Sequence, residues 1–162
     1  MAVDMFLKLD GVPGEARDSA HEKEIDIHTY KWSVEQLGDF SHGFGGGVGR
    51  VNINKLMCVK SVDASSAMLT KCCVNGRHIP TGKLTVRKAG GEKQVEYVIY
   101  EFEKIIVTSV EVSVDQKSEG IDEVVHLSFQ KVTFKYQEQG DDGAKLGGEK
   151  EFSYDVATNL VA

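Results

Sequence analysis

The chain has few cysteines, few prolines and no long hydrophobic run, and each shortage excludes a class of protein. Its 162 residues include three cysteines and two prolines. Three cysteines, two of them adjacent, do not make a disulfide framework, so folding in a reducing cytoplasm is expected. The N-terminal segment 1–11 has no basic region followed by an apolar stretch. We therefore expect neither a cleaved signal peptide nor insertion into a membrane.

The chain also lacks a surplus of positive charge. Lys and Arg number 19 against 25 Asp and Glu, which gives a formal net charge of −6. Binding to nucleic acid or to an anionic membrane needs clustered cations, so neither is an expected partner. With 41% hydrophobic and 27% charged residues, the composition is that of a folded protein, and residues 1–162 are expected to form one domain.

Alternating apolar and polar residues predict that most of the chain is β-strand. The predicted strands span residues 3–9, 24–34, 50–60, 82–88, 94–114, 123–137 and 150–156. The apolar face changes parity near His28, which predicts a bulge, and again at Gln130-Lys131. Within 94–114, one face is expected to carry Val98, Tyr100, Phe102, Ile106, Val110, Val112 and Val114. Short turns between strands predict an antiparallel arrangement, either a small barrel or a sandwich.

One segment has helical spacing instead. Residues 63–75 place small and apolar side chains three and four apart, with Asp63, Ser65 or Ser66 available to cap the start. Gly76 supplies a left-handed stop. Residues 10–23 are polar and aperiodic, which predicts a loop. The fold class is thus mainly β, with one short α-helix at about residues 63–75.

The glycine cluster at 43–50 does not match a phosphate-binding loop. Val48 stands where the dinucleotide fingerprint requires a third glycine, and the cluster leads into a strand instead of a helix. We interpret it as a flexible loop that presents Phe44, followed by Gly45, Gly46 and Gly47, to a partner.

No sequence pattern indicates an enzyme active site, a metal site or a cofactor site. Cys72 and Cys73 are adjacent without further metal ligands, so they are expected to be small apolar packing residues on the predicted helix. The five histidines are scattered at positions 21, 28, 42, 78 and 126. Glu101 and Glu103 are expected to form a solvated stripe on the outer face of the sheet. The pair Arg87-Lys88 is expected to be a charge that flanks a turn.

Several short motifs together resemble the haemolysin-coregulated protein (Hcp) family of type VI secretion systems, nearly end to end. They are Met5-Phe6-Leu7-Lys8-Leu9-Asp10-Gly11, Gly14-Glu15, His21, Glu24-Ile25-Asp26-Ile27, Gly82-Lys83-Leu84-Thr85-Val86-Arg87-Lys88-Ala89-Gly90-Gly91, Glu96-Tyr97, Ser109-Val110, Asp142-Gly143 and Tyr154-Asp155. The resemblance implies an antiparallel two-sheet β-barrel with one helix. It implies homo-hexameric rings that stack into a tube, with sheath and spike proteins as partners.

By the same resemblance, the protein is cytoplasmic before assembly, is secreted without a signal peptide, and carries effector proteins in its lumen. The loop with Phe44 would contact the next ring. The chain departs from the family at Tyr30-Lys31-Trp32, where many relatives have Trp-Ser-Trp. If the register holds, Lys31 lines the lumen and changes which cargo surfaces it accepts.

A different class of function remains open on the residues alone. A monomeric antiparallel barrel that binds a small apolar ligand would have a similar strand pattern. The two hypotheses differ in oligomeric state, because the tube subunit is expected as a hexamer and the ligand-binding barrel as a monomer.

Overall fold

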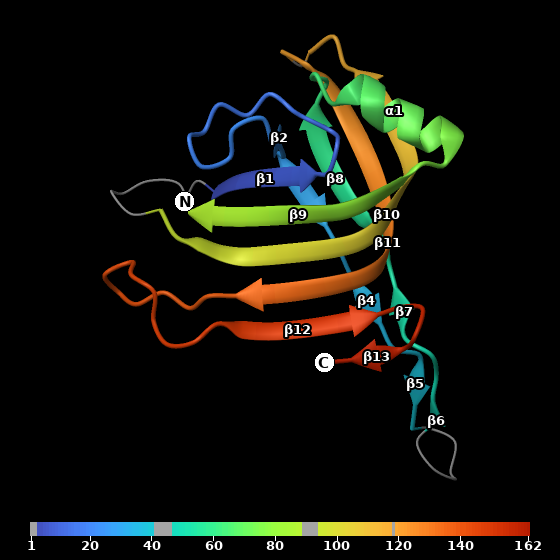
Figure 1. Ribbon diagram of the computed structural model, residues 1–162, viewed down its shortest axis with the longest axis vertical. Coiled ribbons are helices and arrows are strands. Elements are labelled where there is room, and N and C mark those ends of the chain that lie inside the picture. The colour runs from blue at the N-terminus through green and yellow to red at the C-terminus, as the bar shows by residue number, and fades with distance from the viewer. Residues whose placement is uncertain (1–2, 41–46, 89–93, 118) are drawn as a thin grey trace.

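The structure, a computed structural model, is mainly β with one short helix (Figure 1). It describes residues 3–40, 47–88, 94–117 and 119–162. The long strands are β1 (Val3–Leu9), β8 (Leu56–Ser61), β9 (His78–Lys88), β10 (Glu96–Val114), β11 (Ile121–Tyr136) and β12 (Lys150–Asp155), and the helix is α1 (Ser66–Asn75). The short strands are β2 (Ile25–Asp26), β3 (Thr29–Lys31), β4 (Val34–Glu35), β5 (Gly38–Asp39), β6 (Gly47–Val48), β7 (Asn52–Ile53) and β13 (Leu160–Val161).

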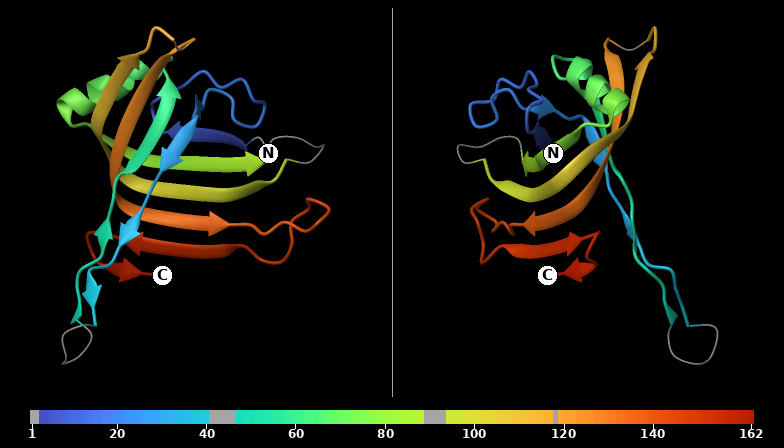
Figure 2. Two further views of the ribbon diagram at one scale, coloured as in Figure 1. Left: turned by 180° about the vertical axis from the view of Figure 1, so that it is seen from behind. Right: turned by 45° about the vertical axis from the view of Figure 1, so that its right-hand side comes forward.

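The two longest strands, β10 and β11, form an antiparallel pair that extends through both parts of the structure. Their register runs from Val98 opposite Tyr136 to Val114 opposite Ile121. The first half of β10 pairs with β9, and the second half of β11 pairs with β12. The first half of β11 pairs instead with β8, which pairs with β3. The pair therefore belongs to two antiparallel sheets, and Figure 2 shows it bending from one to the other.

The predicted barrel is not confirmed. In the part of the chain that the structure describes, the hydrogen-bonded path runs β13-β12-β11-β10-β9-β1-β2, with β8 and β3 branching from β11. The segment predicted as one strand over 24–34 is divided: β2 pairs with β1, while β3 pairs with β8. His28 lies in the break between them, and its backbone N–H donates to Val59 O at 2.8 Å. The parity change expected near His28 is therefore the point at which the chain stops pairing with β1 and begins to pair with β8.

The predicted face of β10 is wrong at Ile106, while Val110 lies on the core side with Tyr100 and Phe102, as predicted. Phe102 is buried, but the next buried residues are Ile105 and Val107, so the inward face changes parity. Lys104 explains the shift, because its φ of 52° takes one residue out of the extended conformation. A second register shift between Val107 and Ser109 restores the original parity. On β11 the parity change at 130–131 is confirmed, because burial passes from odd to even positions there.

Aromatic and aliphatic side chains from both sheets fill the core. Phe102 and Phe129 lie with ring centroids 4.7 Å apart, and Tyr100 packs against Phe134 at 5.1 Å. The fully buried aliphatic members include Leu7, Ile25, Leu56, Leu69, Leu84, Ile105 and Leu127. Burial of this apolar surface is the main term that favours folding.

Helix α1 begins three residues later than predicted and ends as predicted. Gly76 closes it in the left-handed region, with φ of 65°. Leu69 and Cys72 are buried in the core, and Cys73 is half-buried against it, which confirms that the adjacent cysteines are packing residues. Cys58 is also buried, and this burial raises the pKa of its thiol to about 12.

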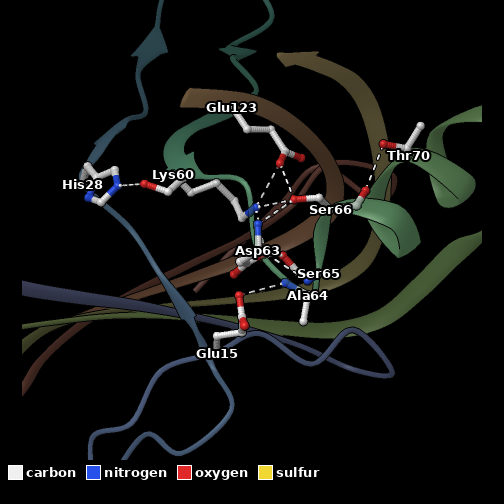
Figure 3. A network of polar contacts seen from close by, with 10 residues as sticks. Glu15, His28, Lys60, Asp63, Ala64, Ser65, Ser66, Thr70 and Glu123 are labelled. Atoms are coloured by element: carbon white, nitrogen blue, oxygen red, sulfur yellow. Dashed lines mark hydrogen bonds and ion pairs between the residues drawn. The ribbon is translucent and has the colours of Figure 1, made fainter. Parts of the chain in front are cut away.

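A buried charged network attaches the start of α1 to the sheet (Figure 3). Lys60 on β8 lies directly opposite Glu123 on β11, and both side chains are at most 1% exposed. The Lys60 Nζ lies 3.1 Å from Glu123 Oε2, 2.9 Å from Asp63 Oδ1 and 3.2 Å from Ser66 Oγ. Ser66 Oγ also donates to Glu123 Oε2. The network therefore connects two strands with the first residue of the helix.

Replacing Lys60 alone should be far more costly than replacing the pair. Lys60→Met would leave the fully buried Glu123 carboxylate without its cation, which should lower the free energy of unfolding by about 3–5 kcal/mol. In Lys60→Met/Glu123→Leu no buried charge remains at this pair, so most of that loss should be recovered. Urea denaturation of both variants measures the difference. A double variant no more stable than the single one would contradict this account.

Candidate functional site

The histidines that the structure describes are not gathered into a group that could hold a metal ion. Across the described ranges, no group of three or more His, Cys, Asp or Glu side chains is arranged to hold a metal ion. His28 Nε2 lies 2.8 Å from Ser61 Oγ, but the pair is exposed. No described carboxylate is hydrogen-bonded to the second ring nitrogen, so the third group that orients a catalytic imidazole is missing from this pair. His42 lies outside the described residues.

The paired carboxylates on β10 belong to a solvated stripe, as predicted. Glu101 lies 3.3 Å from Lys135 Nζ and Glu103 lies 3.9 Å from Lys131 Nζ, with side chains 44% and 58% exposed. Each carboxylate has its own lysine on the neighbouring strand β11. Exposed pairs of this kind contribute little to stability and leave no carboxyl pair arranged for acid–base catalysis.

Residues 10–24, of which 10–23 are predicted as a loop, fold back over the side of β1 that faces away from the core. We call this segment the strap. The Gly14 N–H donates to Lys23 O at 2.7 Å, and the Ala16 N–H donates to Glu24 O at 2.9 Å. The ring of His21 stacks on Phe6 with centroids 4.4 Å apart. Phe6 and His21 are 5% and 4% exposed, so the strap buries a second, smaller cluster.

Arg87 is part of this cluster, whereas the sequence predicted only a charge that flanks a turn. Its side chain is 5% exposed, and its guanidinium group lies 4.9 Å from the centroid of the Phe6 ring. It pairs with Asp4 at 3.3 Å and forms a two-pronged contact with Asp18. The hydrogen bond from Arg87 holds the pKa of the Asp18 carboxyl down, at about 2. Alternation alone gave no sign that a strap covers this end of β9.

His21 makes two further contacts that fix the strap. Its Nδ1 lies 2.9 Å from Glu24 Oε2, and its Nε2 lies 2.9 Å from Glu96 Oε1 at the start of β10. Gly14, His21, Glu24, Arg87 and Glu96 are among the residues on which the family resemblance rests. In the structure His21 contacts Glu24 and Glu96, and Gly14 lies close to the Glu24 backbone. Arg87 pairs with Asp4 and Asp18 in the same cluster. Their role here is to hold the strap on the sheet.

Lys31 is exposed at the end of β3, while the preceding Tyr30 points into the core. Burial, and contact with Tyr100, raise the pKa of Tyr30. Lys31 borders a surface depression of about 590 Å³, whose other charged residues are Lys55 and Glu35. The depression is also lined by Trp32, Ser33, Asn52, Ile53, Asn54, Met57 and His126. Sequence reasoning identified Lys31 but missed Lys55, which lines the same depression.

A thin two-stranded arm extends away from both sheets (Figure 2). It is made by the pairs β4–β7 and β5–β6, each only two residues long. Leu37 is 77% exposed and Phe40 is 93% exposed. The predicted contact residues Phe44, Gly45 and Gly46 lie outside the described residues, and Gly47 begins β6. Phe40 is an additional exposed aromatic residue that the sequence interpretation did not single out.

Comparison with known proteins is consistent along the whole chain. Residues 6–136 match the family model described as "Type VI secretion system effector, Hcp". The chain is 41% identical to Protein hcp1 of Pseudomonas aeruginosa over 162 residues, covering 100% of both chains. It is similar to the crystal structure of Hcp1 from Salmonella typhimurium, with a TM-score of 0.83, 33% identity and 100% of both chains covered. A structure described as a type six secretion system protein gives a TM-score of 0.93 at 27% identity, covering 99% of this chain and 100% of that one.

These comparisons agree with the geometry. Within the described ranges, no helix is long and apolar enough to cross a membrane. The residues of the family motifs hold the strap and the sheets in place. The matches extend over both sheets, the helix and the arm. The chain therefore belongs to the Hcp family of structural type VI secretion proteins.

Proposed function

We propose that this chain is a tube subunit of a type VI secretion system. In this proposal residues 1–162 act as one Hcp-like domain, six copies form a ring, and rings stack into an inner tube that carries effector proteins. Sheath and spike proteins of the machine are its other partners, and the protein passes from the cytoplasm to the outside without a signal peptide. Likeness over the full chain to Hcp proteins supports this function most strongly.

The arm supports the assembly part of the proposal. An isolated two-stranded hairpin is only marginally stable in water, and this one exposes Leu37 and Phe40. Contact with another copy would bury these side chains. Each chain carries a net charge of −6, so like-charged copies repel one another unless the contacts are apolar or of opposite charge. Head-to-tail contacts between different surfaces give a ring when the rotation closes.

The first prediction concerns the oligomeric state. Size-exclusion chromatography with light scattering, at micromolar concentration and physiological salt, should give six times the 17.8 kDa of one chain. Low salt should loosen the ring, if it has any effect, because screening of the like charges is then weakest. A monomer would contradict the proposal and favour the alternative, a monomeric barrel for a small apolar ligand.

The second prediction concerns the arm. Burying one phenylalanine contributes roughly 1.5–3 kcal/mol, and a ring interface repeats the contact six times. Phe44→Ala should leave the hexamer intact but abolish stacking and secretion. Phe40→Ala should weaken stacking in the same direction. Val74→Ala, which removes an 83% exposed side chain from helix α1, is the matched control and should behave as wild type. Normal secretion of Phe44→Ala would show that the arm has another role.

Lys31 and Lys55 support a cargo preference within the same proposal. Two ammonium groups against one carboxylate make the depression positive on an otherwise acidic chain. Six copies would repeat this charge around the lumen, if Lys31 faces it. We expect such a wall to favour cargo with acidic surfaces and to repel basic ones.

The third prediction follows from that charge. A labelled decaglutamate peptide should bind the assembled wild-type protein, and added salt should weaken the binding. Lys31→Glu should weaken it at least about tenfold, since six attractive contacts become repulsive. Lys71→Glu changes an exposed lysine on helix α1 by the same charge and serves as control. Equal losses in the two variants would mean that net charge, and not this depression, governs binding.

A further inference from the structure

The far end of the β10–β11 hairpin carries apolar side chains that stay exposed to solvent. Val112 and Val114 on β10 are 56% and 67% exposed, and Ile121 on β11 is 43% exposed. Val62, just past the end of β8, is 42% exposed, and its N–H donates to Ile121 O at 3.0 Å. These strand ends therefore present one apolar surface, which we call the tip.

The register places the tip on the core side of the sheet. Val112 lies opposite Glu123, and Val114 lies opposite Ile121. Residues directly opposite each other in an antiparallel pair point to the same face, and here Glu123 is fully buried. Ser66 at the start of α1 contacts Glu123, whereas the row beyond it stays exposed. The tip thus continues the core face past the end of its cover, and an apolar surface of this kind marks a site of contact.

The backbone of β10 is also open along one side of the tip. β9 pairs with β10 only as far as Ile106, whereas β11 pairs with it as far as Val114. Among the strands that the structure describes, none pairs with the other edge of β10 from Val107 to Val114. An unpaired edge beside an apolar face is able to accept an extended segment of another chain.

The arm of a second copy fits this acceptor in shape, chemistry and position. It is a narrow two-stranded ribbon that exposes Leu37 and Phe40. The arm and the tip lie at opposite ends of the longest axis of the molecule (Figures 1 and 2). A contact between opposite ends of identical molecules repeats from copy to copy without closing, which builds a filament.

Charge favours the same pairing. Between positions 111 and 122 the chain has one lysine against four carboxylates, those of Glu111, Asp115, Glu119 and Asp122. Between positions 31 and 55, a stretch that includes the arm, it has three cations against two carboxylates. On a chain with a net charge of −6, the stretch with the arm is therefore a better electrostatic match for the acidic tip than the average surface of another copy.

We propose that the tip is the acceptor for the arm of a copy in the next ring. In this contact Leu37 and Phe40 cover Val114 and Ile121, and the open edge of β10 lies along a strand of the arm. The inference rests on the proposed function, because it names the surface on which one ring receives the next.

Chemical cross-linking of the whole protein tests the contact. Leu37→Cys/Val114→Cys, treated with a short bismaleimide, should give a ladder of chains longer than a dimer, because each copy donates its arm to one neighbour and its tip to another. Leu37→Cys/Leu146→Cys is the control, since Leu146 is 51% exposed between β11 and β12. Mass spectrometry should find position 37 joined to position 114 at least about ten times more often than to position 146 in the control.

A further pair of variants separates docking on the tip from chance collision. Val112→Asp, added to the first cysteine pair, would place a carboxylate in the apolar contact and should lower the linkage at least about tenfold. Val74→Asp adds the same charge at an 83% exposed position on α1 and should leave the linkage unchanged. Equal losses in the two variants would overturn the contact in favour of a general effect of charge.

Light scattering distinguishes failure of this inference from failure of the proposed function. Hexamers that show no more linkage of position 37 to position 114 than the control would overturn the contact between arm and tip and leave the ring standing. A monomeric wild type would overturn the proposed function and this inference with it.

Discussion

The long antiparallel pairing of β10 with β11 is the constraint on which the rest of the structure depends. The two strands stay paired over nearly their whole length, with one register shift after Val107, while their outer neighbours change from β9 and β12 to β8. A strand that serves two sheets must bring different residues to the core in each part. Lys104, with its positive φ, and the shift after Val107 make that change on β10, and β11 changes parity at 130–131.

Buried cations attach the non-strand segments to this frame. Lys60 connects Asp63 at the approach to helix α1 with Glu123 on β11, and Arg87 connects the strap with β1. In both places a nearly unexposed cation lies between two carboxylates, an arrangement in which removing one partner is costly. The chain therefore has an excess of acidic residues overall, while the buried charges of Lys60 and Arg87 are paired with carboxylates. The arm is different, because its apolar side chains Leu37 and Phe40 are exposed.

Strand content, the helix and its glycine stop could be predicted because alternation and capping are local properties. The same logic also placed Glu101 and Glu103 on the solvated face. The reversal of the buried face at residues 105–107 of β10 could not be predicted, because nothing in the residue type of Lys104 announces a positive φ. The strap and the burial of Arg87 depend on contacts between segments far apart in the chain. Lys60 and Glu123 are two residues away from buried apolar residues on their own strands. Their inward direction therefore follows from the alternation of the sequence.

Two of the surfaces proposed for assembly lie close together in the chain. The arm and the depression beside Lys31 are both on the β3–β7 stretch of the chain, next to each other in sequence. Electron microscopy of the purified protein tests the central claim most directly. Class averages should show six-fold rings with an open lumen, and charge-specific gold labels should bind within it. Averages of small particles without rotational symmetry would contradict the account.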